Sequence, residues 1–461
     1  MNYTRKQFDV VVIGAGPGGL GAALQAARNG ARTLLVDKNG YLGGNLTLGL
    51  PLLGFLDKDG KRVIRGLAEE FMEDLRAYKT PYGVAASDHL ACPMHNSVTL
   101  YDHEIFKFVA IRKVLDAGIE LLLHTEVESA NVDNGTLKSV VLSGKSWKIL
   151  VEAKVFIDAT GDGDLAYLTG AHYEKGQKDT GVIQPPTLMF TVRGVDEEKL
   201  LQFIADHPEQ MQLCDTIEVG RGYDAEFFRA HPNYVLVGLR KLFMEMKAAG
   251  KLPVDRDTLI AIKSLLPGEI HLNCTRHLGT DGSDVFSLTH AEIEGYLQIE
   301  KFVDFLREYV PGFEGCYITN IYPTMGIRES RRFRAIRTLC EEEAVNGVIG
   351  EETIGIGSYI VDIHMGDGSG TIVKKIPPYG LPYGITVSAD VEGLMFAGRC
   401  AGMDAVVMSS ARVMPICMAI GEGAGVGAAL AVKQGISPKD VDVQEVRRIL
   451  KESGVMLEPE K

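Results

Sequence analysis

The sequence lacks paired cysteines, a long apolar run and an excess of basic charge. Its seven cysteines are scattered without a Cys-x-x-Cys spacing, which argues against a disulfide framework, an iron–sulfur cluster and a redox-active dithiol. No stretch reaches about 18 uninterrupted apolar residues, so we expect no membrane span. With 61 acidic and 48 basic residues the net charge is −13, which disfavours nucleic acid and anionic membranes as partners. The cysteines are Cys92, Cys214, Cys274, Cys316, Cys340, Cys400 and Cys417.

Signals for export and for a metal site are missing as well. The first ten residues carry charges, and glycines interrupt the apolar run that follows them, so we expect a cytoplasmic protein. Histidine, cysteine and acidic side chains do not converge at a metal-ligand spacing, so we expect no metal. A chain of 461 residues exceeds one compact core, so we expect two domains or one domain with large insertions.

A glycine-rich turn follows the first apolar segment. Residues 8–38 read FDVVVIGAGPGGLGAALQAARNGARTLLVDK, which predicts a strand, a turn, a helix and a second strand. Gly14 permits the tight turn, Gly16 lets the backbone approach a pyrophosphate, and Gly19 lets the helix pack closely on the strand. Asp37 closes the second strand, where a carboxylate can accept hydrogen bonds from both hydroxyls of an adenosine ribose. The segment therefore predicts a dinucleotide site.

Two later segments have the same character and come in a fixed order. Residues 155–157 form an apolar strand that runs into ATGDGD, and the strand in GLMFAGRC ends at Gly398 and Arg399. A nicotinamide dehydrogenase needs only one such loop, whereas FAD lies against several separated pieces of one sheet. The Arg399 guanidinium suits a pyrophosphate, and the positive end of the helix after it could face the flavin pyrimidine. The order of the three segments favours FAD over NAD.

These segments, together with IRESRR at 327–332 and the stretch 398–421, carry a family resemblance. The chain resembles the FAD-dependent oxidoreductase family of the glutathione-reductase-like flavoprotein superfamily. More narrowly, it is similar to a bacterial branch that carries IRESRR and GR…RVMPxCMAxG segments. The resemblance covers nearly the whole chain and implies FAD as the cofactor. The cofactor-binding residues that it implies are Gly14, Gly16, Pro17, Gly18, Gly19, Asp37, Lys38, Gly43, Gly44, Asn45, Val127, Ala159, Thr160, Gly161, Asp162, Gly398, Arg399 and the turn Ala424, Gly425 and Val426.

Two positions depart from the family's pattern. Residues 382–384 read ProTyrGly where related sequences tend to have PYRSL, and Asp404 stands near the place of a family histidine. The roles that relatives give to that arginine and that histidine therefore do not carry over. The family fixes the cofactor better than the substrate.

The fold class that we predict is α/β, with a doubly wound parallel-sheet, Rossmann-like FAD-binding domain and an inserted α+β substrate or cap domain. Residues 1–175 and 385–435 would form the FAD-binding domain, and residues 176–384 the cap. Residues 436–461 would form a C-terminal helix and tail. Residues 80–100 have turn composition and no clear period, so we expect an irregular segment over the site.

An arginine cluster supplies the first candidates for the chemistry. Arg328, Arg331 and Arg332 would share one basic face if their segment is helical. Such a face could hold a carboxylate or a phosphate near the flavin. The alternative is a solvated face that pairs with Glu329 and the acids at 341–343.

Strand ends in the expected cap supply the other candidates. His271, Arg276 and His364 follow apolar stretches, and each could act as a proton acceptor or donor or be a hydrogen-bonded structural residue. Tyr379 and Tyr383 are more typical of packing residues. Cys92 lies in the expected irregular segment and has no dithiol partner.

The sequence predicts an FAD-dependent oxidoreductase that exchanges a hydride between flavin N5 and a small polar substrate. The reaction would be the oxidation of a CH–OH or CH–NH centre or the reduction of an activated C=C bond. Two alternatives remain open: an NAD(P)H-dependent reductase with FAD as relay, and a flavin-binding electron-transfer or assembly subunit. The first lacks a second strand-coupled GxGxxG. The electron partner and a homo-oligomeric state are also open.

Overall fold

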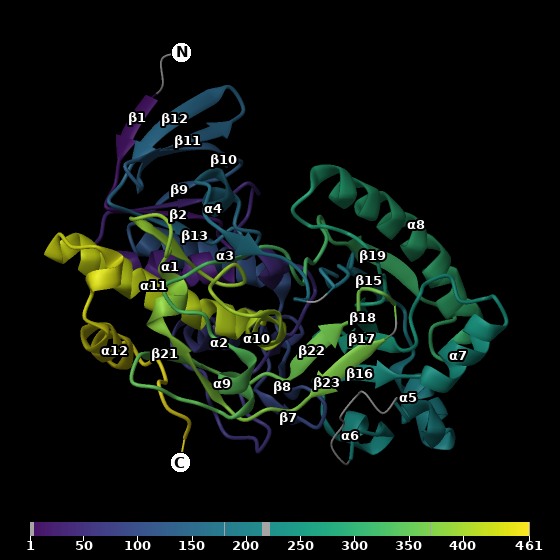
Figure 1. The fold of residues 1–461 in the computed structure, drawn as a ribbon. Coiled ribbons are helices and arrows are strands. Elements are labelled where there is room, and N and C mark those ends of the chain that lie inside the picture. The colour runs from purple at the N-terminus through teal and green to yellow at the C-terminus, as the bar shows by residue number, and fades with distance from the viewer. Residues whose placement is uncertain (1–3, 179, 214–221, 369, 461) are drawn as a thin grey trace.

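The computed structural model describes residues 4–178, 180–213, 222–368 and 370–460 (Figure 1). At its centre lies a five-stranded sheet in the order β25-β13-β2-β3-β9, and all of its neighbouring strands are parallel. The three central strands are buried along their whole length, as in a parallel sheet that is covered on both faces. The predicted α/β class with a Rossmann-like sheet is confirmed. The strands are β2 (Val10–Ile13), β3 (Thr33–Val36), β9 (Glu120–Leu122), β13 (Val155–Asp158) and β25 (Leu394–Phe396).

Two long helices, α1 (Pro17–Arg28) and α11 (Met414–Gln434), pack with their backbones in direct contact. A Cβ atom on Gly425 would lie 2.2 Å from the carbonyl oxygen of Ala22. Glycine is therefore required where the two helices meet. By length and composition α11 could cross a membrane, but 94% of its apolar window is buried inside the protein. A core helix passes the same test, so this is weak evidence for a span.

A second sheet contains the first strand of the chain and has the order β1-β12-β11-β10. The hairpin between β10 and β11 turns at Asn134 and Gly135, which have φ angles of 48° and 77°. Such positive angles at both positions are typical of a two-residue hairpin turn. The strands are β1 (Thr4–Gln7), β10 (Glu126–Asp133), β11 (Thr136–Gly144) and β12 (Trp147–Glu152).

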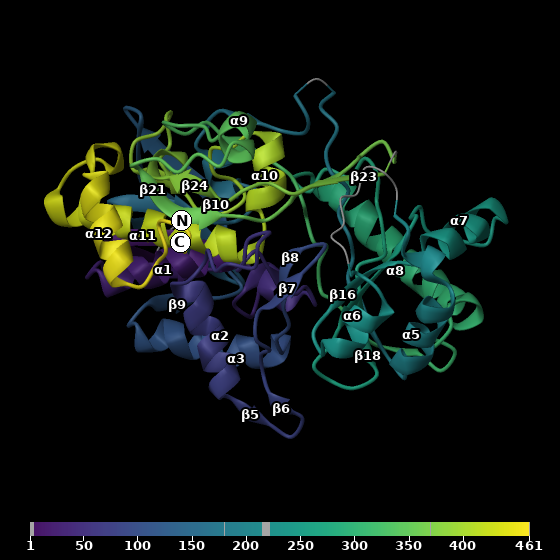
Figure 2. The ribbon, with the colours of Figure 1, turned by 90° about the horizontal axis from the view of Figure 1, so that it is seen from below.

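A third sheet, in the order β16-β17-β18-β15-β19, forms a separate body beside the first, the teal part of Figures 1 and 2. It has its own hydrophobic core, and the long helix α8 (Val285–Tyr309) contributes several of the buried side chains of that core. We call this body the cap. Its strands are β15 (Phe190–Arg193), β16 (Val235–Gly238), β17 (Leu259–Lys263), β18 (Glu269–Leu272) and β19 (Tyr317–Ile321), and its other helices are α5 (Glu197–Asp206), α6 (Ala225–Ala230) and α7 (Arg240–Ala248).

Residues 333–384 were expected in the cap, but their buried side chains belong to the core of the first sheet. Ile354 on β21, and Tyr379 and Leu381 on β24, pack there because β21 lies against α11. The domain division stays a prediction. The elements of this return segment and of the C-terminus are β20 (Arg332–Phe333), α9 (Glu341–Val345), β21 (Thr353–Gly357), β22 (Val361–His364), β23 (Thr371–Lys374), β24 (Tyr379–Pro382), α10 (Ala405–Ala411) and α12 (Val443–Glu452).

The segment 80–100, expected to be irregular, instead contains short strands. β7 (Leu90–Cys92) and β8 (Asn96–Thr99) form a hairpin that continues into β4. Turn-rich composition concealed these strands because each has only a few residues. The remaining elements are β4 (Leu52–Leu53), α2 (Leu67–Ala77), β5 (Lys79–Thr80), β6 (Gly83–Val84), α3 (His103–Asp116), α4 (Asp164–Leu168) and β14 (Tyr173–Glu174).

Candidate active site

One cavity of about 720 Å³ runs from the carboxyl ends of β2, β3, β13 and β25 to the face of the cap sheet. Ligands of open α/β sheets bind at this end of the strands. Most of the predicted cofactor residues line the cavity. They are Gly14, Gly16, Pro17, Gly18, Asp37, Lys38, Gly44, Asn45, Val127, Ala159, Thr160, Gly161, Asp162, Gly398 and Arg399.

The first glycine loop leaves the N-terminus of α1 open to the cavity. Gly16 is the N-cap residue, no side chain caps the helix, and a Cβ atom on Gly16 would meet nothing within 4 Å. Free backbone N–H groups at a helix N-terminus attract phosphate. Gly19 does not line the cavity, because it packs so closely that its Cβ would lie 1.8 Å from the Gly14 carbonyl oxygen.

Asp37 is held rigidly at one end of the cavity. Its carboxylate accepts hydrogen bonds from the backbone N–H of Ala15 at 2.7 Å and of Asn39 at 2.8 Å. Burial raises the pKa of Asp37, although these hydrogen bonds lower it in part. Val127 lines the same cavity. The geometry suits the ribose of an adenosine.

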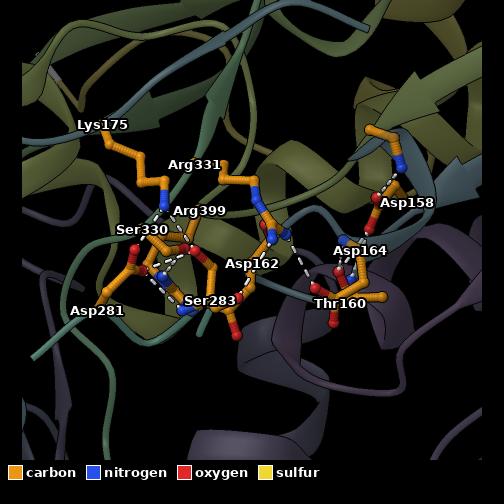
Figure 3. A network of polar contacts seen from close by, with 11 residues as sticks. Asp158, Thr160, Asp162, Asp164, Lys175, Asp281, Ser283, Ser330, Arg331 and Arg399 are labelled. Carbon is orange, nitrogen blue, oxygen red and sulfur yellow. Dashed lines mark hydrogen bonds and ion pairs between the residues drawn. The ribbon is translucent and has the colours of Figure 1, made fainter. Parts of the chain in front are cut away.

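Arg399 was expected to face a pyrophosphate, and the structure gives it an acidic partner as well (Figure 3). Its Nη2 lies 2.8 Å from Asp162 Oδ1, and its Nη1 donates to Ser330 Oγ at 2.7 Å. Asp158 fixes the Asp162 loop by accepting from the N–H of Thr160 at 3.0 Å. Burial raises the pKa of Asp158 to about 6.

The predicted basic face of Arg328, Arg331 and Arg332 does not exist, because residues 327–331 are not helical and Arg332 begins β20. Arg328 lines the cavity, whereas Arg331 donates to Asp164 at 3.1 Å and stacks on the Tyr167 ring. Arg332 forms a buried ion pair with Glu329. Of these three arginines, Arg328 alone lines the cavity.

Two further candidates do not reach the cavity either. His271 lies in the middle of the cap sheet, where its Nδ1 is 2.8 Å from Thr191 Oγ1 and 3.2 Å from the Tyr322 hydroxyl. Arg276 donates to the carbonyl of Met365 at 2.8 Å and so holds the β22–β23 hairpin. Neither lines the cavity, so both are structural in this geometry.

His364 does line the cavity, and it is linked through Asp362 to Arg412. Its Nε2 lies 3.4 Å from Asp362, and Arg412 lies 3.2 Å from the other oxygen of that carboxylate. Burial and the charge of Arg328 lower the pKa of His364, so the imidazole is neutral. Burial raises the pKa of Asp362, but His364 and the guanidiniums of Arg412 and Arg328 outweigh it and hold that pKa well below its usual range.

His95 is a cavity residue that the sequence reasoning missed. It lies in the β7–β8 turn, and its Nδ1 is 3.9 Å from Cys92 Sγ. Burial lowers its pKa to about 4. Within the described part of the chain its Nε2 has no hydrogen-bond partner, so this nitrogen is available to a ligand. A histidine in a turn-rich segment was the only signal.

The N-terminus of α11 is a second missed feature. Val413, Met414 and Cys417 line the cavity, and no side chain caps this helix. The turn predicted at Ala424 to Val426 is wrong, because these residues lie inside α11 and pack on α1. The small residues of this stretch allow that packing.

Several other predicted residues are structural. Gly43 donates to the Ala15 carbonyl at 2.8 Å and does not line the cavity. Asp404 caps α10 by accepting from the Val407 N–H at 2.8 Å. The Tyr379 and Tyr383 hydroxyls bond to Ser410 and to the Pro438 carbonyl inside the core. Six cysteines are free thiols, and Cys214 lies outside the described residues.

A model of the family "FAD dependent oxidoreductase" matches residues 9–450. The chain belongs to the FAD-dependent oxidoreductase family. Its cofactor is FAD, and its fold is Rossmann-like, as predicted from the sequence. The narrower bacterial branch stays a prediction.

Curated relatives of this FAD-dependent oxidoreductase match over about a third of the chain. The thiamine thiazole synthase of Aeropyrum pernix is 28% identical over 190 residues, which are 38% of this chain and 62% of that protein. The digeranylgeranylglycerophospholipid reductase of Methanosphaerula palustris is 26% identical over 167 residues, 34% of this chain and 39% of its own. A solved geranylgeranyl bacteriochlorophyll reductase-like protein from Thermoplasma acidophilum has 13% identity and a TM-score of 0.47, covering 98% of this chain and 85% of its own.

The residues present fit FAD along the whole cavity. The open N-terminus of α1 would hold the pyrophosphate, and Asp37 the adenosine ribose. The loop at Gly44 and Asn45 and the N-terminus of α11 would hold the flavin. Two uncapped helix N-termini would therefore hold one anionic cofactor.

Proposed function

We propose that this FAD-dependent oxidoreductase exchanges a hydride with a small polar substrate held between the flavin end of the cavity and the cap sheet. When bound, FAD supplies N5 as the hydride acceptor or donor. The observation that carries the proposal is the continuity of the cavity. One space is lined both by the nucleotide loops and by ionisable side chains, among them His95, Arg328 and His364.

The proton that accompanies the hydride needs an acceptor, and we assign this role to His95. Its imidazole is neutral, the residue lines the cavity, and its one hydrogen bond within the described residues is made by Nδ1, which leaves Nε2 unpaired. His364 is a poorer acceptor, because Asp362 and Thr371 lie against its two nitrogens. In an oxidation the substrate would lose a hydride from carbon and a hydroxyl or amine proton to His95.

The N-terminus of α11 supports the same chemistry. The positive end of a helix favours negative charge, and no side chain caps the first turn, where Met414 and Ile416 carry N–H groups and Pro415 has none. This helix end would stabilise the negative charge that the flavin ring gains on reduction.

An anaerobic reduction experiment tests the proposal. The FAD-loaded protein is mixed with hydroxy acids, amines, sugars and, after chemical reduction, with unsaturated acids, while the flavin absorbance is followed. Bleaching or reoxidation by one small molecule is expected. Reduction by NAD(P)H alone would favour the relay reductase, and reduction by a protein donor alone would favour an electron-transfer subunit. Either of these two results would overturn the proposal.

A further inference from the structure

Two guanidinium groups face the cavity without a carboxylate partner. Arg256 is only 4% exposed, and both Arg256 and Arg328 line the cavity. Within the described ranges of the chain, no Asp or Glu oxygen lies within 4.0 Å of either group. Arg412, by contrast, is matched by Asp362. A buried cation that is hydrogen-bonded but lacks an anionic partner is costly, so a site of this kind is best explained by an anionic ligand.

Asn273 holds the two guanidiniums side by side. Its Oδ1 accepts from Arg328 Nη2 at 3.2 Å and from Arg256 Nη2 at 3.3 Å. Arg328 Nη1 is fixed by Thr187 Oγ1 at 2.8 Å, and Arg256 Nη2 also donates to the Asn273 carbonyl at 2.7 Å. Burial and the charges of Arg256 and Arg412 lower the pKa of Arg328. We call Arg256, Asn273 and Arg328 the arginine fork.

An apolar wall adjoins the arginine fork. Val235 pairs with Ile262 and Val237 with Ile260 across β16 and β17, so the four side chains share one face of the sheet. All four line the cavity. The N–H of Asn273 donates to the Ile260 carbonyl at 3.1 Å, which joins the fork directly to this wall.

We propose that the cap half of the cavity binds a carboxylic acid with an apolar body. The carboxylate lies on the arginine fork, whose planar donors match its two oxygens, and the body lies along the apolar wall. That this acid is the substrate rests on the function proposed above. A sugar or a free amine would leave the fork unpaired, and a small hydrophilic acid would leave the wall uncovered.

Saturated acids test recognition separately from catalysis, because they carry no oxidisable hydroxyl or amine. The FAD-loaded protein is titrated with acetate, butanoate, hexanoate and octanoate, and binding is followed by calorimetry and by the flavin difference spectrum. Affinity is expected to rise about fourfold per methylene group until the wall is covered. The matching primary alcohols are expected to bind at least tenfold more weakly. Equal binding of acids and alcohols would overturn the proposal.

Substitutions test which part of the site binds the carboxylate of the ligand and which part binds its apolar body. Arg328→Gln and Arg256→Gln are each expected to weaken hexanoate binding about 10- to 100-fold with the FAD content unchanged. Val237→Thr, a change of equal size, is expected to reduce the gain per methylene without removing the preference for acids. Arg229→Gln, at an exposed site on α6, is the control and binds like the wild type.

Further measurements distinguish a carboxylate ligand from a phosphate ligand, and a failure of the arginine fork from a failure of the proposed redox function. Hexyl phosphate is expected to bind more weakly than hexanoate, and tighter binding would overturn the assignment to a carboxylate. If alkanoates bind through the fork but no acid exchanges electrons with the flavin, the proposed function fails and the fork stands. If a neutral substrate reduces the flavin equally in the wild type and in Arg328→Gln, the fork fails and the redox function stands.

Discussion

At the scale of single residues, a substitution of His95 distinguishes a role in proton transfer from a role in substrate binding. His95→Gln is expected to lower kcat about 100-fold or more with little change in KM, because the amide cannot accept the substrate proton. Since the pKa of His95 is about 4, kcat/KM of the wild type is expected to be level near neutral pH and to fall as the pH drops through about 4. Steady-state assays with the substrate that the anaerobic experiment identifies measure both quantities.

The exposed His290 on α8 supplies the control for this prediction. His290→Gln removes an imidazole that pairs with Glu294 on the surface, and it is expected to keep wild-type kinetics. A His95→Gln enzyme with unchanged kcat and an unchanged pH profile would show that another group accepts the proton.

The sequence predicted single residues correctly where the role of a residue depends on its place in a local strand–turn–helix segment. Gly14, Gly16 and Asp37 line the cavity as predicted, because strand, turn and helix follow one another locally. The prediction failed for the shared face of Arg328, Arg331 and Arg332, of which Arg328 alone lines the cavity, because the direction of each side chain depends on segments far away. Arg331, for example, meets Asp164, 167 positions earlier in the chain.

At the scale of elements, the contact between α1 and α11 fixes the cofactor site. Gly425→Ala would place a methyl group 2.2 Å from the Ala22 carbonyl oxygen, so the helices must move apart. We expect a loss of unfolding free energy of about 1–3 kcal/mol and weaker FAD retention, since α1 begins at the phosphate loop. Chemical unfolding and the FAD absorbance of the purified protein measure these effects.

Gly350 supplies the matched control for this substitution. A Cβ atom there would meet nothing within 4 Å and its backbone needs no positive φ angle, so Gly350→Ala is expected to be nearly neutral. Equal stabilities of the two variants would show that the helices can separate at little cost.

A buried carboxyl, Glu422, couples three helices to pH. It accepts from the Leu67 N–H at 3.1 Å and from the Gln25 side chain at 2.9 Å, and burial raises its pKa to about 8. The folded state thus binds a proton that the unfolded state releases between about pH 4.5 and 8. Stability is lost as the pH rises through this window, by up to about 1.4 kcal/mol per pH unit.

Glu422→Gln is expected to remove this slope while keeping the shape of the side chain. Its amide could also pair with Gln25 Oε1, a buried atom that has no partner in the described part of the chain. Unfolding free energies of both proteins at pH 5, 6.5 and 8 with saturating FAD give the difference curve. A difference that does not change with pH would mean that Glu422 titrates normally.

The prediction of secondary-structure elements failed where a glycine-rich composition is compatible with both a turn and a helix. The family resemblance implies a cofactor-contacting turn at Ala424 to Val426, yet these residues continue α11. Close packing against the small residues Gly18, Gly21 and Ala22 of α1 compensates for the low helix propensity of glycine. Nothing local in the sequence announces that neighbour.

At the scale of the whole molecule, three distant segments converge as their order in the chain predicted. β2, β13 and β25 are neighbours in one sheet, so their loops meet at one edge. The return of residues 333–384 to the first core was not predicted, because apolar periodicity shows that a segment is buried but not against which core. The arginine fork was missed for the same reason, since its members come from three separate loops.

A polar network joins the cap to the FAD loops, and Arg331 lies at its centre (Figure 3). Its guanidinium donates to the Asp162 carbonyl and to Asp164, both at 3.1 Å, and to the Ser283 carbonyl at 3.4 Å, just before α8 begins. Arg331→Gln is expected to remove the bridge while leaving each core intact. Hydrogen exchange should then quicken both at 160–166 and at 280–288, because each segment loses the same donor. Arg448→Gln, on the surface of α12, should leave the exchange of both segments unchanged. If Arg331→Gln quickens exchange in only one segment, Arg331 does not link the two.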